Sequence, residues 1–120
     1  MKSYLHQFLP RLVGSGKAMG MAMLGDKISA DEAERMGLIW KTYPDDDLMA
    51  EAEKLARKMA SGPTKGYALI KRAMNASLGN DLQTQLDVER DFQQIAHMTE
   101  DFSEGVLAFK EKRTARFKGK

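Results

Sequence analysis

The residues best suited to charged chemistry gather near the end of this chain. Lys110, Lys112 and Arg113 crowd one turn of the last helical pattern, and a short basic tail over 114–120 carries one more aromatic residue, Phe117. Cations suit the negative end of a helix dipole, so the pattern alone is typical of a solvated C-terminal helix with a basic end. A small nucleic-acid binder would use the same charges, but aromatic interleaving and a recognition helix are missing.

Other combinations that could do chemistry are incomplete. His6 and His97 are far apart in the sequence, and neither lies in a metal-binding pattern such as H-E-x-x-H. The acidic run 45–47 lacks the spacing and the bidentate Glu of an EF-hand. The Gly-Ser-Gly run at 14–16 lacks the Gly-Lys-Ser/Thr of a phosphate-binding loop. We therefore predict no catalytic residue and no metal site in this chain.

Composition describes a globular chain of ordinary solubility. Its 120 residues are 42% hydrophobic and 30% charged, so we expect residues 1–120 to form a single domain. The net charge of +2 is too small to indicate nucleic acid. No stretch approaches the ~20 apolar residues of a membrane span, and the first residues lack an apolar export signal. Since cysteine is absent as well, we expect a cytoplasmic protein that binds no membrane.

Short breaks divide the chain into the helices that must position these residues. We expect the first helix to follow the run 14–16 and to end at Gly25. Ser29 and the Glu three residues later form a capping box, which predicts a second helix that ends at Gly37. The segment 38–43 is rich in β-branched and aromatic residues and predicts a short extended piece.

Three longer helical patterns follow. The acidic run 45–47 opens the third helix, Thr64 opens a fourth that ends at Gly79, and Asp81 opens a fifth. Apolar residues recur with helical period on each of them and predict their buried faces. These residues are Leu48, Ala52, Leu55, Ala56 and Met59, then Tyr67, Ile70, Met74 and Leu78, then Leu82, Leu86, Phe92 and Ala96.

The last helix completes a mainly α fold of about six helices and at most one short strand. Phe102, Val106 and Phe109 fall at i, i+4 and i+7 and share one face. Thr99 or Asp101 is expected to accept from the free N–H groups of its first turn.

The same helix carries a family resemblance. Residues 104–119 read E-G-V-x-A-F-x-E-K-R-x-x-x-F-x-G, and related segments at 24–39 and 8–14 occur upstream in matching order. Together they resemble the enoyl-CoA hydratase/isomerase (crotonase) family over essentially the whole chain from Phe8. Within that family, the Leu-Pro-Arg start, Gly-Leu-Ile-Trp and the Phe-Lys-Gly-Lys ending are most similar to ring-epoxide isomerases of phenylacetyl-CoA breakdown.

The resemblance implies the C-terminal helical, or trimerisation, region of a crotonase-like α/β fold. The part of the family's sequence that this chain does not resemble holds the oxyanion hole and the acidic residues that move protons. Residues 1–7 depart from the family pattern, which in the isomerases places a catalytic Asp just before the Leu-Pro-Arg segment. We therefore expect a C-terminal portion that is inactive alone, with apolar helix faces exposed where a partner sheet is missing.

The resemblance also implies where coenzyme A binds. Lys112 is expected to reach the acyl-CoA site of a neighbouring subunit, near the adenosine 3′-phosphate, where an ammonium group is a suitable point charge. Arg113 would add to that field. The family's adenine-packing aromatic corresponds here to Gln93, with Phe92 adjacent, so Phe92 is the aromatic candidate. The alternative for Lys112 is a plain solvated lysine.

Two functions remain open at this level. The resemblance implies a homo-oligomer, a trimer or a dimer of trimers, that hydrates or isomerises acyl-CoA thioesters of fatty-acid or phenylacetate metabolism, with the thioester as substrate and no further cofactor. In that enzyme the chain would supply subunit contacts and part of the adenosine site. The alternative is a non-catalytic helical oligomerisation module that binds no nucleotide, as unpaired apolar helix faces would indicate.

Overall fold

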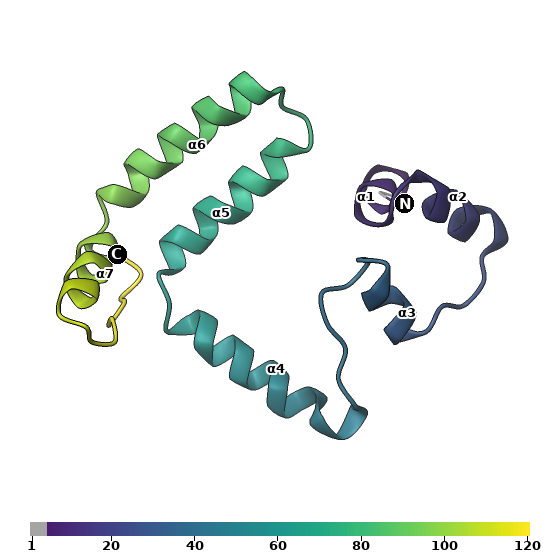
Figure 1. The fold of residues 1–120 in the computed structure, drawn as a ribbon, viewed down its shortest axis with the longest axis horizontal. Helices are drawn as coiled ribbons and strands as arrows, with labels where there is room; N and C mark the ends of the chain where they lie inside the picture. The colour runs from purple at the N-terminus through teal and green to yellow at the C-terminus, as the bar shows by residue number, and fades with distance from the viewer. Residues whose placement is uncertain (1–4) are drawn as a thin grey trace. The chain divides into compact units, whose positions relative to one another are not determined.

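Helices make up most of the chain (Figure 1). The computed structural model describes residues 5–120, which contain seven helices and no strand. Their bounds are α1 Leu5–Val13, α2 Ser15–Leu24, α3 Ala30–Arg35, α4 Asp45–Ala60, α5 Thr64–Ser77, α6 Leu82–His97 and α7 Glu100–Lys110. The mainly α fold class is therefore confirmed. Helix α1 is an addition that the sequence patterns did not predict, and the departure of residues 1–7 from the family pattern lies partly outside the described residues.

Most helix ends fall where local sequence signals put them. The Ser29 hydroxyl accepts the N–H of Glu32 at 3.2 Å at the start of α3. The Asp81 carboxylate accepts the N–H of Thr84 at 2.8 Å at the start of α6. Gly25 ends α2 with a φ of 69°, in the left-handed region that glycine adopts without a steric penalty. These caps depend on residues close in sequence, and for that reason they were predictable.

The segment 38–43, predicted as a short extended piece, forms no strand. The Leu38 N–H donates to the Ala33 carbonyl at 2.9 Å and the Gly37 N–H to the Glu34 carbonyl at 3.0 Å, a Schellman motif that ends α3 at Gly37. Thr42 donates both its N–H and its hydroxyl to the carboxylate of Glu34, at 2.6 and 2.5 Å, and these bonds lower the pKa of Glu34. The segment therefore satisfies its polar groups on α3 instead of pairing with a strand.

The described residues fall into two units, one that ends at Glu51 and one that begins at Ala52. In the first unit α1 packs on α2. In the second, α5 and α6 run antiparallel side by side (Figure 1), and α7 contacts α6. The buried apolar residues are Leu9, Ala18 and Ala33 in the first unit and Leu69 and Ala108 in the second.

The helix faces predicted to be buried lie largely open. Leu48 and Met59 of α4 are 48% and 51% exposed, Met74 of α5 is 68% exposed and Leu86 of α6 is 50% exposed. An apolar stripe is buried only where a second surface covers it, and residues 5–120 contain no sheet to do so. The prediction that the helices expose apolar faces in the absence of a partner sheet is thereby confirmed.

Candidate functional site

Helix α7 ends in a turn that gives Lys112 an unusual backbone conformation. The Lys112 N–H donates to the Phe109 carbonyl at 3.3 Å, and the Arg113 N–H donates to the Ala108 carbonyl at 3.0 Å. These two bonds define a Schellman motif, in which the residue with positive φ is usually glycine. Here that residue is Lys112, with a φ of 52°. Among residues 5–120 it is the one non-glycine residue with positive φ.

The left-handed conformation of Lys112 has an energetic cost that requires an explanation. The left-handed region costs an L-residue roughly 1–2 kcal/mol relative to the right-handed one, and Lys112 is exposed, so packing around its side chain does not offset that cost. Backbone outliers of this kind cluster at functional sites. The residue that the family resemblance assigned to coenzyme A is therefore also one that backbone preference alone would not select.

Arg113 is adjacent to Lys112, but carboxylates surround its guanidinium. Its Nη1 and Nη2 atoms lie 2.6 and 2.9 Å from the two carboxylate oxygens of Glu104, and Nε lies 2.6 Å from Oε2 of Glu111. The hydrogen bonds from Arg113 and from the Arg116 N–H lower the pKa of Glu104 to about 2, and the two carboxylates raise the pKa of Arg113. A phosphate at Arg113 would have to compete with two negative partners.

The start of α7 uses its two candidate caps differently. The Thr99 hydroxyl accepts the Phe102 N–H at 3.0 Å and is the cap. Asp101 lies in the first turn and is only 3% exposed. Its carboxylate accepts the N–H groups of Lys118 and Gly119, at 2.6 and 2.8 Å. Of the two predicted caps Thr99 is confirmed, whereas Asp101 bonds to the tail that follows the helix.

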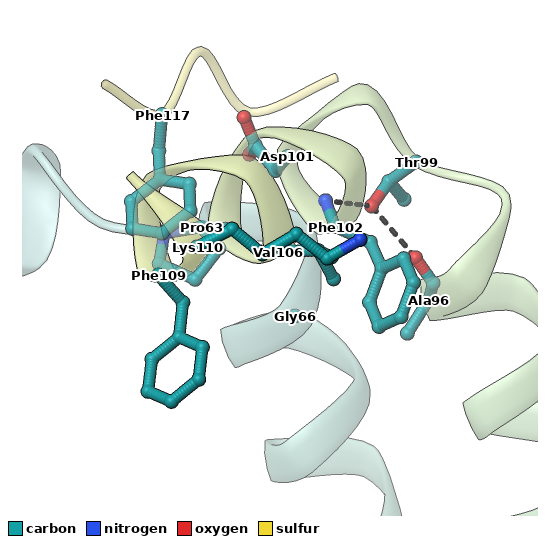
Figure 2. A pocket seen from close by; sticks show the side chains of 11 residues that line it. Pro63, Gly66, Ala96, Thr99, Asp101, Phe102, Val106, Phe109, Lys110 and Phe117 are labelled. Atoms are coloured by element: carbon teal, nitrogen blue, oxygen red, sulfur yellow. Dashed lines mark hydrogen bonds between the residues drawn. The ribbon is translucent and has the colours of Figure 1, made fainter. Parts of the chain in front are cut away.

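An apolar cavity of about 540 Å³ lies against α7, with walls from α5, α6 and the tail (Figure 2). Phe102, Phe109 and Phe117 all contribute to its lining. The Phe109 ring extends away from α7 in Figure 2, and the residue is 86% exposed. Sequence reasoning had placed Phe109 on the apolar face of the helix and missed it as a binding candidate. Its position one turn before Lys112 was the available signal.

Phe92 occupies a different hollow in the same unit. It lies half-buried on α6, and the guanidinium carbon of Arg72 is 4.8 Å from the centre of its ring, a cation–π contact. It lines a cavity of about 340 Å³ between α5 and α6 together with Gln93. The structure thus places Lys112 and Arg113 side by side at the end of α7, and Phe92 in a hollow lined by α5 and α6.

Residues 5–120 contain no group of three or more His, Asp or Glu residues arranged to hold a metal ion. None of the helices in that range combines the length and the apolar character needed to cross a bilayer.

The fold and its last helix correspond to a known family. The family model for enoyl-CoA hydratase/isomerase matches residues 1–120. The chain therefore belongs to the enoyl-CoA hydratase/isomerase family, which confirms the resemblance inferred from the three sequence segments.

Two curated relatives illustrate the match. The chain is 47% identical over 112 residues to "1,2-epoxyphenylacetyl-CoA isomerase" of Escherichia coli (strain K12), covering 93% of this chain and 43% of the relative. It is 45% identical over 113 residues to "Probable enoyl-CoA hydratase" of Rhodobacter capsulatus, covering 94% of this chain and 44% of the relative. The chain thus spans less than half the length of these relatives.

Solved structures agree with the helical arrangement. A putative enoyl-CoA hydratase from Streptomyces coelicolor A3(2) matches 98% of this chain with a TM-score of 0.92 and 35% identity, over 42% of its own length. An enoyl-CoA hydratase from Bacillus anthracis matches 97% of this chain with a TM-score of 0.90 and 38% identity, over 45% of its length.

Proposed function

We propose that this chain is the C-terminal portion of an enzyme that hydrates or isomerises acyl-CoA thioesters. Membership of the enoyl-CoA hydratase/isomerase family supports this reading. The two relatives named above, an isomerase of 1,2-epoxyphenylacetyl-CoA and a probable enoyl-CoA hydratase, support the same substrate class. Chemistry of this kind needs donors that stabilise a thioester enolate as charge develops on its oxygen. Those donors would come from outside this chain, which supplies part of the coenzyme A site and subunit contacts.

Lys112 is the residue proposed to bind the adenosine 3′-phosphate. The observation that carries this proposal is its φ of 52° at a position where glycine is usual. A side chain kept at a strained position is better explained by what its ammonium binds than by stability. A phosphate dianion is a suitable partner, because charge-assisted hydrogen bonds to it are about twice as strong as neutral ones.

The aromatic partner for the adenine has two candidates. Phe109 lies one helical turn before Lys112 and leaves 86% of its surface exposed, so its ring is open for stacking. Phe92 has its ring against Arg72, which leaves less of it available. We therefore propose Phe109 ahead of Phe92. For Arg113, the ion pairs with Glu104 and Glu111 favour a role in fixing the turn over direct contact with phosphate.

Calorimetric titration of the chain with coenzyme A and with 3′-dephospho-CoA tests the proposal. We expect coenzyme A to bind more tightly by about tenfold, the worth of one charge-assisted hydrogen bond. Lys112→Asn should abolish the difference, since asparagine tolerates the left-handed region and lacks the charge. Lys58→Asn on α4 removes the same charge elsewhere and should leave the difference intact. Equal affinity of the unchanged chain for both ligands would contradict the phosphate assignment.

A chimera tests the reaction. The segment of the E. coli isomerase that this chain matches would be replaced by residues 1–120, and turnover of 1,2-epoxyphenylacetyl-CoA and of a simple enoyl-CoA would be measured. Isomerisation of the epoxide supports the ring-isomerase assignment, whereas hydration alone favours the broader class. A folded, oligomeric chimera without either activity would contradict the proposal that the chain can complete such an enzyme.

A non-catalytic oligomerisation module is the second candidate. The observation behind it is the open apolar surface of α6, where Leu82 and Leu86, one helical turn apart, are 75% and 50% exposed. Exposed patches of this kind commonly mark interaction sites. Light scattering that gives one discrete oligomer, combined with calorimetry that detects no coenzyme A binding, would favour this candidate over the first.

A further inference from the structure

We propose that Asp101 and Glu104 are positioning residues that clamp the tail 114–120 back along α7 and thereby fix the turn that presents Lys112. This inference rests on the proposed role of Lys112 in binding the coenzyme A phosphate. The two carboxylates lie three residues apart, so they share one face of the helix. Each of them bonds to two separate groups in the segment 113–119.

Asp101 holds the far end of the tail. Its two carboxylate oxygens accept one N–H each, from Lys118 at 2.6 Å and from Gly119 at 2.8 Å. Its own N–H donates to the Lys120 carbonyl at 3.1 Å. In Figure 2 the carboxylate points towards the tail that carries Phe117. A carboxylate that is 3% exposed and bonded on both oxygens ties the two segments firmly, because losing either bond would leave a buried acceptor unsatisfied.

Glu104 holds the near end, next to Lys112. Its carboxylate pairs with the guanidinium of Arg113 and also accepts the N–H of Arg116 at 2.7 Å. Arg113 supplies the second bond of the Schellman turn, its N–H to the Ala108 carbonyl. Residues on the C-terminal side of Lys112 are therefore fixed to α7 through both backbone and side chain.

Packing of the tail against both α5 and α7 supports the clamp. Gly119 has a φ of 72°, and a Cβ added there would lie 2.5 Å from Oγ1 of Thr64 at the start of α5. A Cβ added at Gly105 on α7 would lie 3.6 Å from the ring of Phe117, which shows how closely that ring covers the helix. The tail is thus held between the carboxylates of α7 and the start of α5.

The consequence concerns Lys112. A lysine in the left-handed region tends to relax towards the right-handed one, which would redirect its side chain. The clamp restrains the chain on the C-terminal side, and α7 restrains it on the N-terminal side. Restraint from both sides fixes the direction in which the Lys112 side chain leaves the backbone before the ligand arrives, which raises affinity by reducing the ordering required on binding.

The test uses Asp101→Asn, Gly119→Ala and the control Glu100→Gln in the full chain. Asparagine has one side-chain oxygen acceptor where aspartate has two. Its amide NH₂ group would face one of the two backbone N–H donors and could not accept its hydrogen bond. Gly119→Ala disturbs the tail from its own side without changing α7 or any charge. Glu100→Gln removes an exposed charge from the same first turn. Amide exchange at Lys118 and Gly119 should speed up about tenfold or more in the first two variants and stay unchanged in the control.

The affinity ratio between coenzyme A and 3′-dephospho-CoA separates positioning from a purely structural role. Loss of structure would lower the affinity for both ligands alike, whereas misplacement of Lys112 would lower the ratio of the two affinities. We expect Asp101→Asn and Gly119→Ala to bring the ratio from about tenfold to within about twofold of one. Added to Lys112→Asn, either change should have no further effect on the ratio, because both act through the same ammonium.

Three results would overturn the inference, and each has a different meaning. If the unchanged chain shows no preference for the 3′-phosphate, the proposed function fails, and the positioning role fails with it. If the unchanged chain shows the preference and the tail amides lose protection while the ratio stays constant, the proposed function stands and the positioning role is wrong. Unchanged protection in both tail variants would show that the clamp itself does not hold the tail.

Discussion

Arg113 and Glu104 form a two-point ion pair although they lie nine positions apart in the sequence. Their paired nitrogen and oxygen atoms lie 2.6 and 2.9 Å apart, and the side chains are 35% and 22% exposed. The bidentate geometry fixes the direction of both groups, which a single contact would not do. Because Glu104 also accepts the Arg116 N–H, one carboxylate connects the turn after α7 and the tail to the helix.

We expect Arg113→Lys to loosen this connection. Lysine is a point charge without the planar fork, so it cannot pair with both oxygens in the same fixed geometry. The thermal midpoint should fall by roughly a few degrees, and exchange at the Arg116 amide should accelerate. Circular dichroism and amide exchange measure the two effects.

Arg57→Lys is the matched control for this change. Arg57 pairs with Glu53 at 3.3 Å on α4, where the side chains are 81% and 63% exposed. Pairs this open contribute little to stability, so the midpoint should not move. Equal shifts of the thermal midpoint in the two variants would show that the bidentate geometry of the Arg113 pair does not contribute to stability.

Acid should weaken the same connection within a defined pH range. Bonds from Arg113 and the Arg116 N–H lower the pKa of Glu104 from 4.5 to about 2. The folded state therefore favours the ionised carboxylate, and its contribution to stability is complete above the unfolded-state pKa. That contribution is lost as the pH falls from about 4.5 towards 2. Thermal midpoints recorded from pH 7 to 2 should show the decline.

Glu104→Gln separates the contribution of Glu104 to acid sensitivity from the contributions of the other carboxylates. The pKa values of Glu34 and Asp81 are also lowered, by bonds from Thr42 and Thr84, so the unchanged chain loses stability in acid for several reasons. The difference in midpoint between the unchanged chain and Glu104→Gln should shrink as the pH falls through this range. A difference that stays constant down to pH 2 would be inconsistent with an ionised, bonded Glu104.

The features that depend on residues close together in the chain could be predicted from the sequence. Ser29, Asp81 and Thr99 each cap a helix through an N–H three residues ahead, and this spacing is visible in the sequence. The family resemblance likewise rests on contiguous motifs and gave the correct family. Of the candidate site, it supplied Lys112 as a residue to consider before any geometry was known.

The features that could not be predicted from the sequence depend on partners far away along the chain. Asp101 had the type and place of a helix cap, but its partners Lys118 and Gly119 lie 17 and 18 residues away. The apolar stripe of α4 was visible, but whether a stripe is buried depends on what covers it. The left-handed conformation of Lys112 carried no local signal, because the pattern for such a turn is a glycine.

Thr99→Ala should confirm that the cap is the threonine and not the aspartate. Removing the hydroxyl leaves the Phe102 N–H without its acceptor at 3.0 Å, and loss of such a cap costs about 1 kcal/mol. Thr99→Ser retains the oxygen and should restore most of that stability. Denaturant unfolding gives the comparison, and a Thr99→Ala variant as stable as the unchanged chain would contradict the assignment.

Lys112→Gly should stabilise the chain while removing its preference for the 3′-phosphate. Glycine avoids the left-handed penalty of roughly 1–2 kcal/mol, offset in part by about 0.4–1 kcal/mol of added flexibility in the unfolded chain. The net gain should be on the order of 0.5–1 kcal/mol in denaturant unfolding. The same substitution at Lys71, inside α5, should instead cost about 1 kcal/mol. A gain in stability with a loss of phosphate preference is the pattern expected where binding, and not folding, requires the lysine. If Lys112→Gly is destabilising, the backbone at this position is not strained, and the main physical argument for Lys112 as a ligand fails.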